Sequence, residues 1–158
     1  MYRIAKVALG AVLLASGTMA SAQRVRITNL TDVNFGTINN LAADAINSQS
    51  VCVWANGSGS DYSITATGSG PGGSFSLMNG SWQLPYQVRW NSQPGQTNGT
   101  LLSAGTPITN QVTNAQNQTC GNGPPTTASL IVVLPSASLS SATAGSYSGT
   151  LTLIVAPE

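Results

Sequence analysis

Short runs of alternating apolar and polar residues recur along this chain, separated by clusters of glycine, asparagine, proline and serine. The runs span residues 25–30, 33–38, 50–54, 62–67, 75–78, 86–90, 129–134 and 147–155. Because successive side chains of a strand point to opposite faces, this pattern predicts short strands joined by turns. The run at 129–134 is almost wholly apolar, which predicts a central strand covered on both faces. We therefore expect an all-β, antiparallel sandwich of about seven strands.

The composition excludes much of the chemistry that proteins perform. The chain has 158 residues, no histidine and a charged fraction of only 6%. Without histidine there is no imidazole base and no imidazole metal ligand. Two cysteines are too few for a structural zinc site, and a net charge of +1 argues against a phosphate-binding surface. We expect no metal, no cofactor and no nucleic-acid partner.

The acidic residues are too scattered for a catalytic pair. Asp32, Asp44, Asp61 and Glu158 are the four acidic residues, and all lie in turn-like contexts. Glycoside hydrolysis usually needs two carboxylates at a fixed separation. Beyond residue 22 there is neither lysine nor histidine to activate the many hydroxyl groups. We expect the protein not to be an enzyme.

Residues 1–22 have the pattern of a secretory signal peptide. Arg3 and Lys6 precede an apolar run at 7–15, and the Ala-Ser-Ala sequence at 20–22 supplies a cleavage site. The alternative, a membrane anchor, requires an apolar run of about 20 residues. We expect an exported protein without membrane insertion after cleavage, whose residues 23–158 form a single domain.

Cys52 and Cys120 are the two cysteines of the chain. In an oxidising compartment a pair of thiols is normally a disulfide. The alternative, a reactive thiol, requires a nearby cation or imidazole that lowers its pKa, and neither cysteine has such a neighbour in the sequence. We expect a structural disulfide between them.

The last predicted strand begins at Tyr147 and is followed by very little sequence. A tyrosine in this place resembles the tyrosine corner of immunoglobulin (Ig)-like sandwiches, which precedes their penultimate strand. The sequence ends at Glu158, three residues beyond Val155. We therefore expect an incomplete Ig-like sandwich whose final strand is missing. Its unpaired edge would be filled by donor-strand complementation from another chain.

Several stretches together resemble the spore coat protein U family, which includes subunits of archaic (Csu-type) chaperone–usher pili. They are VNFGTI at 33–38, SVCVW at 50–54, YSITA at 62–66, LPY at 84–86, WN at 90–91, Cys120, and AGSYSGTLTL at 144–153. Their order and spacing carry the resemblance, since each stretch alone is a weak signal.

The resemblance implies a subunit of a surface fibre that serves adhesion and biofilm formation. A periplasmic chaperone would first fill the missing-strand groove, and at an outer-membrane usher the N-terminal segment of the next subunit would replace it. The protein would pass through the periplasm to an extracellular pilus. By position, six residues would line the acceptor groove: Val33, Phe35, Ile38, Leu151, Leu153 and Val155.

The expected donor segment is short compared with that of polymerising members of the family. Residues 23–31 precede the first family motif, and Val25, Ile27 and Leu30 are its candidate donor residues. The same span is alternatively the start of the first strand, in which case the subunit accepts a strand but does not donate one. A shaft position and a tip or minor position both remain open.

The rival hypothesis is a self-complete carbohydrate-binding or coat domain that works as a monomer. Its sugar platform would use the aromatic residues Trp54, Tyr62, Trp82, Tyr86 and Trp90. Alternation puts residues 86, 88 and 90 on one face, which favours a role in the core. Trp82 instead lies in a turn-rich stretch, so it is the best candidate for a surface contact.

Overall fold

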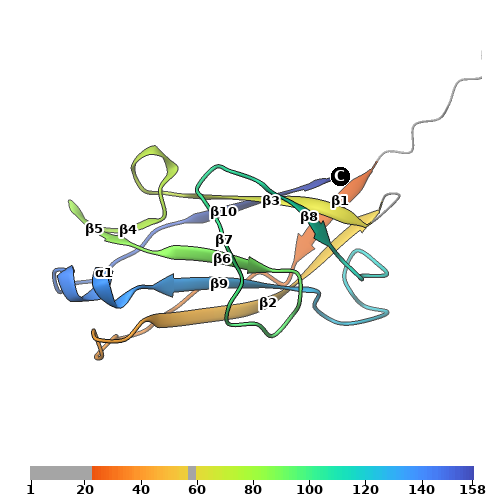
Figure 1. Ribbon diagram of the computed structural model, residues 1–158. Helices are drawn as coiled ribbons and strands as arrows, with labels where there is room; N and C mark the ends of the chain where they lie inside the picture. The colour runs from red at the N-terminus through yellow and green to blue at the C-terminus, as the bar shows by residue number, and fades with distance from the viewer. Residues whose placement is uncertain (1–22, 57–59) are drawn as a thin grey trace, which may run out of the picture.

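The computed structural model describes residues 23–56 and 60–158, so the predicted signal peptide lies outside the described residues. Within these residues two sheets stack on each other (Figure 1). One sheet has the strand order β1-β2-β9-β6-β7 and the other the order β10-β3-β8, while β4 and β5 form a separate hairpin. All strand pairs are antiparallel. The prediction of an all-β, Ig-like antiparallel sandwich is confirmed.

The strands are β1 (Arg24–Thr28), β2 (Ala45–Asn56), β3 (Asp61–Gly68), β4 (Ser76–Asn79), β5 (Trp82–Pro85), β6 (Gln87–Asn91), β7 (Thr100–Leu101), β8 (Ile108–Val112), β9 (Ala128–Leu134) and β10 (Leu151–Pro157). A 3₁₀ turn at Pro71–Gly73 and the short helix α1 (Ser136–Ser141) complete the described elements.

Strand β9 is the centre of the larger sheet and is buried along its whole length. Leu130 and Val132 on its inner face belong to the hydrophobic core between the sheets. On its outer face, the Ser129 hydroxyl donates to the Gln93 carbonyl oxygen at 2.8 Å and accepts from the Gln96 amide at 3.0 Å. The loop after β6 therefore covers the outer face, and the predicted doubly covered strand is confirmed.

A buried aromatic pair joins the two sheets. Trp90 of β6 donates its indole N–H to the Tyr62 hydroxyl of β3 at 3.1 Å, and the two rings meet edge to face at 85°. Both side chains are almost completely buried. Burial raises the pKa of Tyr62, because the phenolate would lose its hydration. The polar atoms of both rings are thereby satisfied inside the core.

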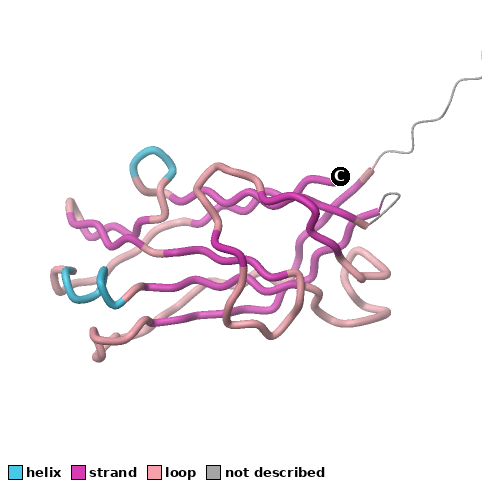
Figure 2. Tube along the Cα trace, in the orientation of Figure 1, coloured by secondary structure: helices cyan, strands magenta, loops and turns pink. Residues whose placement is uncertain are grey.

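The predicted strand at 33–38 is wrong. Residues 29–43 form no helix or strand, and Figure 2 draws this stretch as loop. Nor do they take part in any backbone–backbone hydrogen bond among the described residues. A strand exists only when a neighbour supplies its ladder, and no described strand pairs its backbone with this stretch.

The predicted disulfide is confirmed, since Cys52 of β2 is bonded to Cys120 across a sequence separation of 68 residues. Both cysteines are buried, and the alternative of a free reactive thiol is thereby excluded. The bond ties the loop before β9 to the larger sheet.

We predict that Cys52→Ser lowers the free energy of unfolding by roughly 4 kcal/mol, because the unfolded chain regains the entropy of a long loop. Urea titration of oxidised protein, followed by circular dichroism, measures the change. The wild type in reductant is the control and should unfold near the midpoint of the variant. Equal midpoints for the variant and the oxidised wild type would show that the bridge contributes no stability.

Candidate functional site

Strand β10 has a partner on only one of its two sides. It pairs with β3 in an unbroken register from Leu151 opposite Gly68 to Pro157 opposite Tyr62. It is the outermost strand of its sheet, and no strand of the described residues pairs with its other side. The final strand of an Ig-like sandwich lies at this edge. No described strand therefore forms a ladder on the free side of β10, although β1 of the larger sheet packs against part of β10.

The side chains of β10 alternate between the core and the solvent. Leu151, Leu153 and Val155 are half-buried and pack against the hydrophobic core, whereas Ile154 points away and is 58% exposed. The inward residues of the neighbouring strand β3, Tyr62, Ile64 and Ala66, are completely buried, so the core is less completely covered beside β10. The free side of β10 thus has unpaired backbone groups next to the half-buried side chains of Leu151, Leu153 and Val155. Sheet edges that accept a strand from another chain have this combination.

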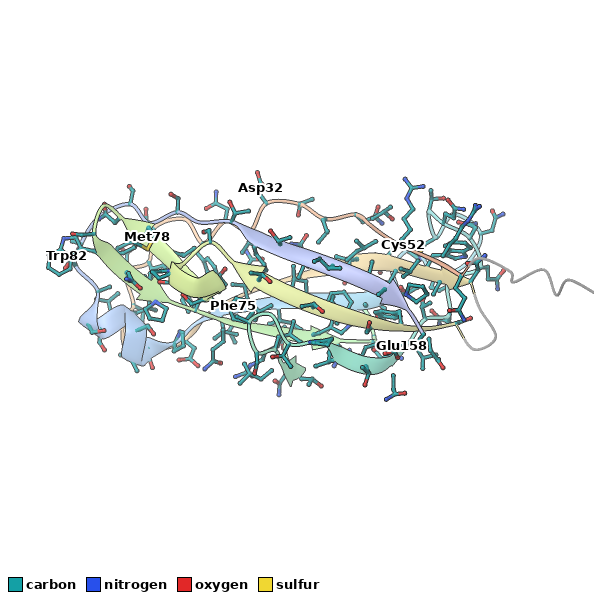
Figure 3. All side chains as sticks on the ribbon, turned by 90° about the horizontal axis from the view of Figure 1, so that it is seen from above. Asp32, Cys52, Phe75, Met78, Trp82 and Glu158 are labelled. Carbon is teal, nitrogen blue, oxygen red and sulfur yellow. A yellow bond between two sulfur atoms is a disulfide. The ribbon has the colours of Figure 1, made fainter. Side chains whose placement is uncertain are left out.

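The stretch 29–43 forms a second border of the half-covered core. Val33, Phe35 and Ile38 are half-buried and pack against the core, although their backbones join no ladder. Figure 3 shows this stretch, at Asp32, on the flank of the sandwich that β10 also borders. We call β10 and residues 31–38 together the open edge.

All six predicted groove residues are accordingly half-buried side chains on one core. Val25 and Ile27, which the sequence suggested as donor residues, are half-buried against the same core. Asn47 and Gln49 of β2, whose side chains hydrogen-bond to residues 31–34, were not predicted from the sequence.

The candidate donor residues lie within the fold of their own chain. Val25 stands opposite Ala55 and Ile27 opposite Val53 in the β1–β2 pair, and both pack against the core. Leu30 follows the end of β1 and is 43% exposed. In this structure the span is therefore the first strand, which was the second of the two roles weighed from the sequence.

Trp82 is exposed, as expected for a surface contact. It begins β5 after the hairpin turn, is 57% exposed, and lies at the end of the molecule opposite Glu158 (Figure 3). Tyr62, Tyr86 and Trp90 are buried in the core, so none of them offers a ring face to a sugar. Trp82 alone of these four is placed to do so.

Residues 23–56 and 60–158 contain neither a metal-binding cluster nor a membrane-spanning helix. No group of three or more His, Cys, Asp or Glu side chains is arranged to hold a metal ion within this part of the chain. No helix in the same residues is long and apolar enough to cross a membrane.

No protein-family model and no curated protein matches this sequence. Among solved structures, a chain of a chaperone–tip adhesin complex of CFA/I fimbriae matches with a TM-score of 0.53 and 16% identity, over 86% of this chain and 41% of that chain. A chain of the chaperone–tip subunit pre-assembly complex of archaic chaperone–usher Csu pili from Acinetobacter baumannii matches with a TM-score of 0.44 and 23% identity, over 85% and 39%. The first match shows a shared fold, and this chain spans less than half of either matched chain.

We predict that Trp82→Ala changes the free energy of unfolding by no more than about 0.5 kcal/mol, because its side chain is mostly in solvent. Trp90→Ala is the matched comparison and should cost about 3–5 kcal/mol, because it empties a core position. Chemical denaturation of both variants measures the difference. A large cost for Trp82→Ala would instead assign this side chain to packing.

Proposed function

We propose that this protein is a pilin-type subunit of a surface fibre assembled by a chaperone–usher pathway. The observation that carries the proposal is the free side of β10, which lies beside a half-covered core in an Ig-like sandwich. A strand from another chain would pair with β10 and become the final strand of the sheet. The protein would act by association and not by catalysis.

The energy for association comes from two sources at the open edge. An added strand would pair backbone N–H and C=O groups of β10 that lack protein partners. It would also complete the burial of Leu151, Leu153 and Val155, which are half-buried now. Full burial of such a side chain is worth about 1.5–3 kcal/mol, so completing all three would contribute about 2–4 kcal/mol.

The proposed partners are a periplasmic chaperone, an outer-membrane usher and other pilus subunits. The fold shared with a chain from a chaperone–tip adhesin complex supports a chaperone partner. One of the stretches that resemble the spore coat protein U family, AGSYSGTLTL at 144–153, leads into β10, the strand with the free side. We propose export through the periplasm to the cell surface, with a role in adhesion and biofilm formation.

We assign the segment around Val25 and Ile27 to the subunit's own fold. Donation of these residues to a neighbour would require β1 to leave β2, with the loss of their five paired positions. The subunit would therefore accept a strand at β10 with β1 in place, and it would donate its own N-terminal segment only after β1 leaves β2.

One observation favours a second candidate function. Trp82 presents an exposed indole ring, and such a ring can stack on a sugar. A self-complete carbohydrate-binding domain would use this contact as a monomer, with the side of β10 left in water.

We predict that residues 23–158, produced in a bacterial periplasm without a cognate chaperone, aggregate, are degraded or polymerise, because the open edge exposes unpaired backbone next to apolar side chains. Size-exclusion chromatography over time at high concentration distinguishes the two candidates. Protein that stays monomeric and undegraded would contradict the fibre-subunit proposal and support the self-complete domain.

Leu153→Asp and Ile154→Asp form a matched pair for the same assay. The aspartate at 153 would enter the half-covered core, where desolvation of its charge is costly, and should block polymerisation and complex formation with a chaperone. The aspartate at 154 would lie on the exposed face and should leave both unchanged. Equal behaviour of the two variants would contradict the assignment of Leu153 to the open edge.

A further inference from the structure

Two amide side chains stand on the core-facing side of β2, where an Ig-like sandwich normally has apolar residues. Asn47 lies opposite Val132 and Gln49 opposite Leu130 in the β2–β9 pair. Both partners belong to the hydrophobic core, and directly opposed residues of an antiparallel pair share one face. Asn47 and Gln49 therefore point toward the side of β2 that faces the other sheet.

The carboxamide of Gln49 replaces a strand partner for Thr31. Its Oε1 accepts from the backbone N–H and from the hydroxyl of Thr31, each at 2.9 Å. Its Nε2 donates to the carbonyl oxygen of Thr31 at 3.0 Å. Two residues of an antiparallel pair exchange the same N–H and C=O bonds, and a carboxamide carries the same donor and acceptor. Gln49 thus satisfies both backbone groups of Thr31.

Asn47 acts on the next part of the same stretch. Its Nδ2 donates to the carbonyl oxygen of Asn34 at 3.0 Å. The Asn34 side chain in turn accepts from the backbone N–H of Gly36 at 2.8 Å. Residues 29–43 make no backbone–backbone hydrogen bond among the described residues. The side chains of Gln49, Asn47 and Asn34 instead bond to backbone groups of this stretch.

We infer that Gln49 and Asn47 are positioning residues that hold residues 31–36 along the flank of the sandwich. Held there, the stretch keeps Val33 and Phe35 against the core and its remaining backbone groups free of a ladder. An incoming strand would then bind between two segments that are already in place, β10 on one side and residues 31–38 on the other. This inference rests on the proposed function, because it assigns the two amides a role in strand acceptance.

Hydrogen exchange on the monomer fraction of freshly refolded residues 23–158 tests the positioning step. Gln49→Leu should speed exchange of the Thr31 amide about ten-fold, as expected for the loss of hydrogen bonds worth about 1 kcal/mol each, and should leave the β9 amides unchanged. Gln83→Leu is the matched control, because Gln83 is an exposed glutamine on β5, and it should exchange like the wild type. Unchanged exchange at Thr31, or parallel acceleration in β9, would overturn the inference.

Gln49→Glu separates hydrogen bonding from space filling at this position. At pH 7 the introduced carboxylate has no donor for the Thr31 carbonyl oxygen and repels it, so residues 31–36 should exchange faster than in the wild type after correction for intrinsic rates. Below the ordinary carboxyl pKa of about 4.3 the protonated group can donate again, and protection should return. Exchange that does not depend on pH would assign position 49 to packing alone.

The link to strand acceptance has its own measurement. Light scattering follows polymerisation of the wild type, Gln49→Leu and Gln83→Leu at equal concentration. We expect the polymerisation half-time of Gln49→Leu to be longer by about ten-fold, in proportion to its faster exchange at Thr31. The half-time of Gln83→Leu should not change. Altered exchange with an unaltered half-time would overturn the role in acceptance. A wild type that remains monomeric would contradict the proposed function itself, while the exchange data still decide whether the amides position residues 31–36.

Discussion

Backbone hydrogen bonding along β10 is the constraint on which the rest of this structure depends. Each strand residue carries one donor and one acceptor, and in an antiparallel sheet these groups point alternately to the two neighbours. Strand β3 satisfies one side of β10 from Leu151 to Pro157. No strand of the described residues pairs with the other side. The half-burial of Leu151, Leu153 and Val155 follows from the same absence, because the strand that would cover them is the one that would pair.

The remainder of the sandwich is firmly held, which makes the open side a local property. Strand β9 is buried on both faces, the Trp90–Tyr62 pair connects the sheets, and the Cys52–Cys120 bond fastens the long loop before β9. A stable frame of this kind can keep one edge uncovered without unfolding. Such an edge is suited to capture a strand of another molecule.

Alternation in the sequence predicted the buried strands well, because burial on one face determines the side-chain pattern. It failed where strand formation depends on a partner. Residues 33–38 alternate like a strand but have no neighbour, so they form none. The strand predicted at 50–54 extends over Ala45–Asn56. Its first part was missed because Asn47 and Gln49 interrupt the apolar pattern at core-facing positions. Strands at Trp82–Pro85 and Ile108–Val112 were missed because exposed and polar residues fill them. The groove residues were placed by family resemblance, because alternation puts Val33 and Phe35 on one face but does not show that this face borders the same groove as β10.

Residue-resolved hydrogen exchange of β10 in the monomer tests the central claim most directly. If one side of β10 is unpaired, its amides should fall into two alternating classes, with those bonded to β3 protected and those between them exchanging nearly as fast as in an unfolded peptide. Uniform protection of every amide from Leu151 to Ala156 in a verified monomer would mean that the chain closes its own sheet, and would contradict the account.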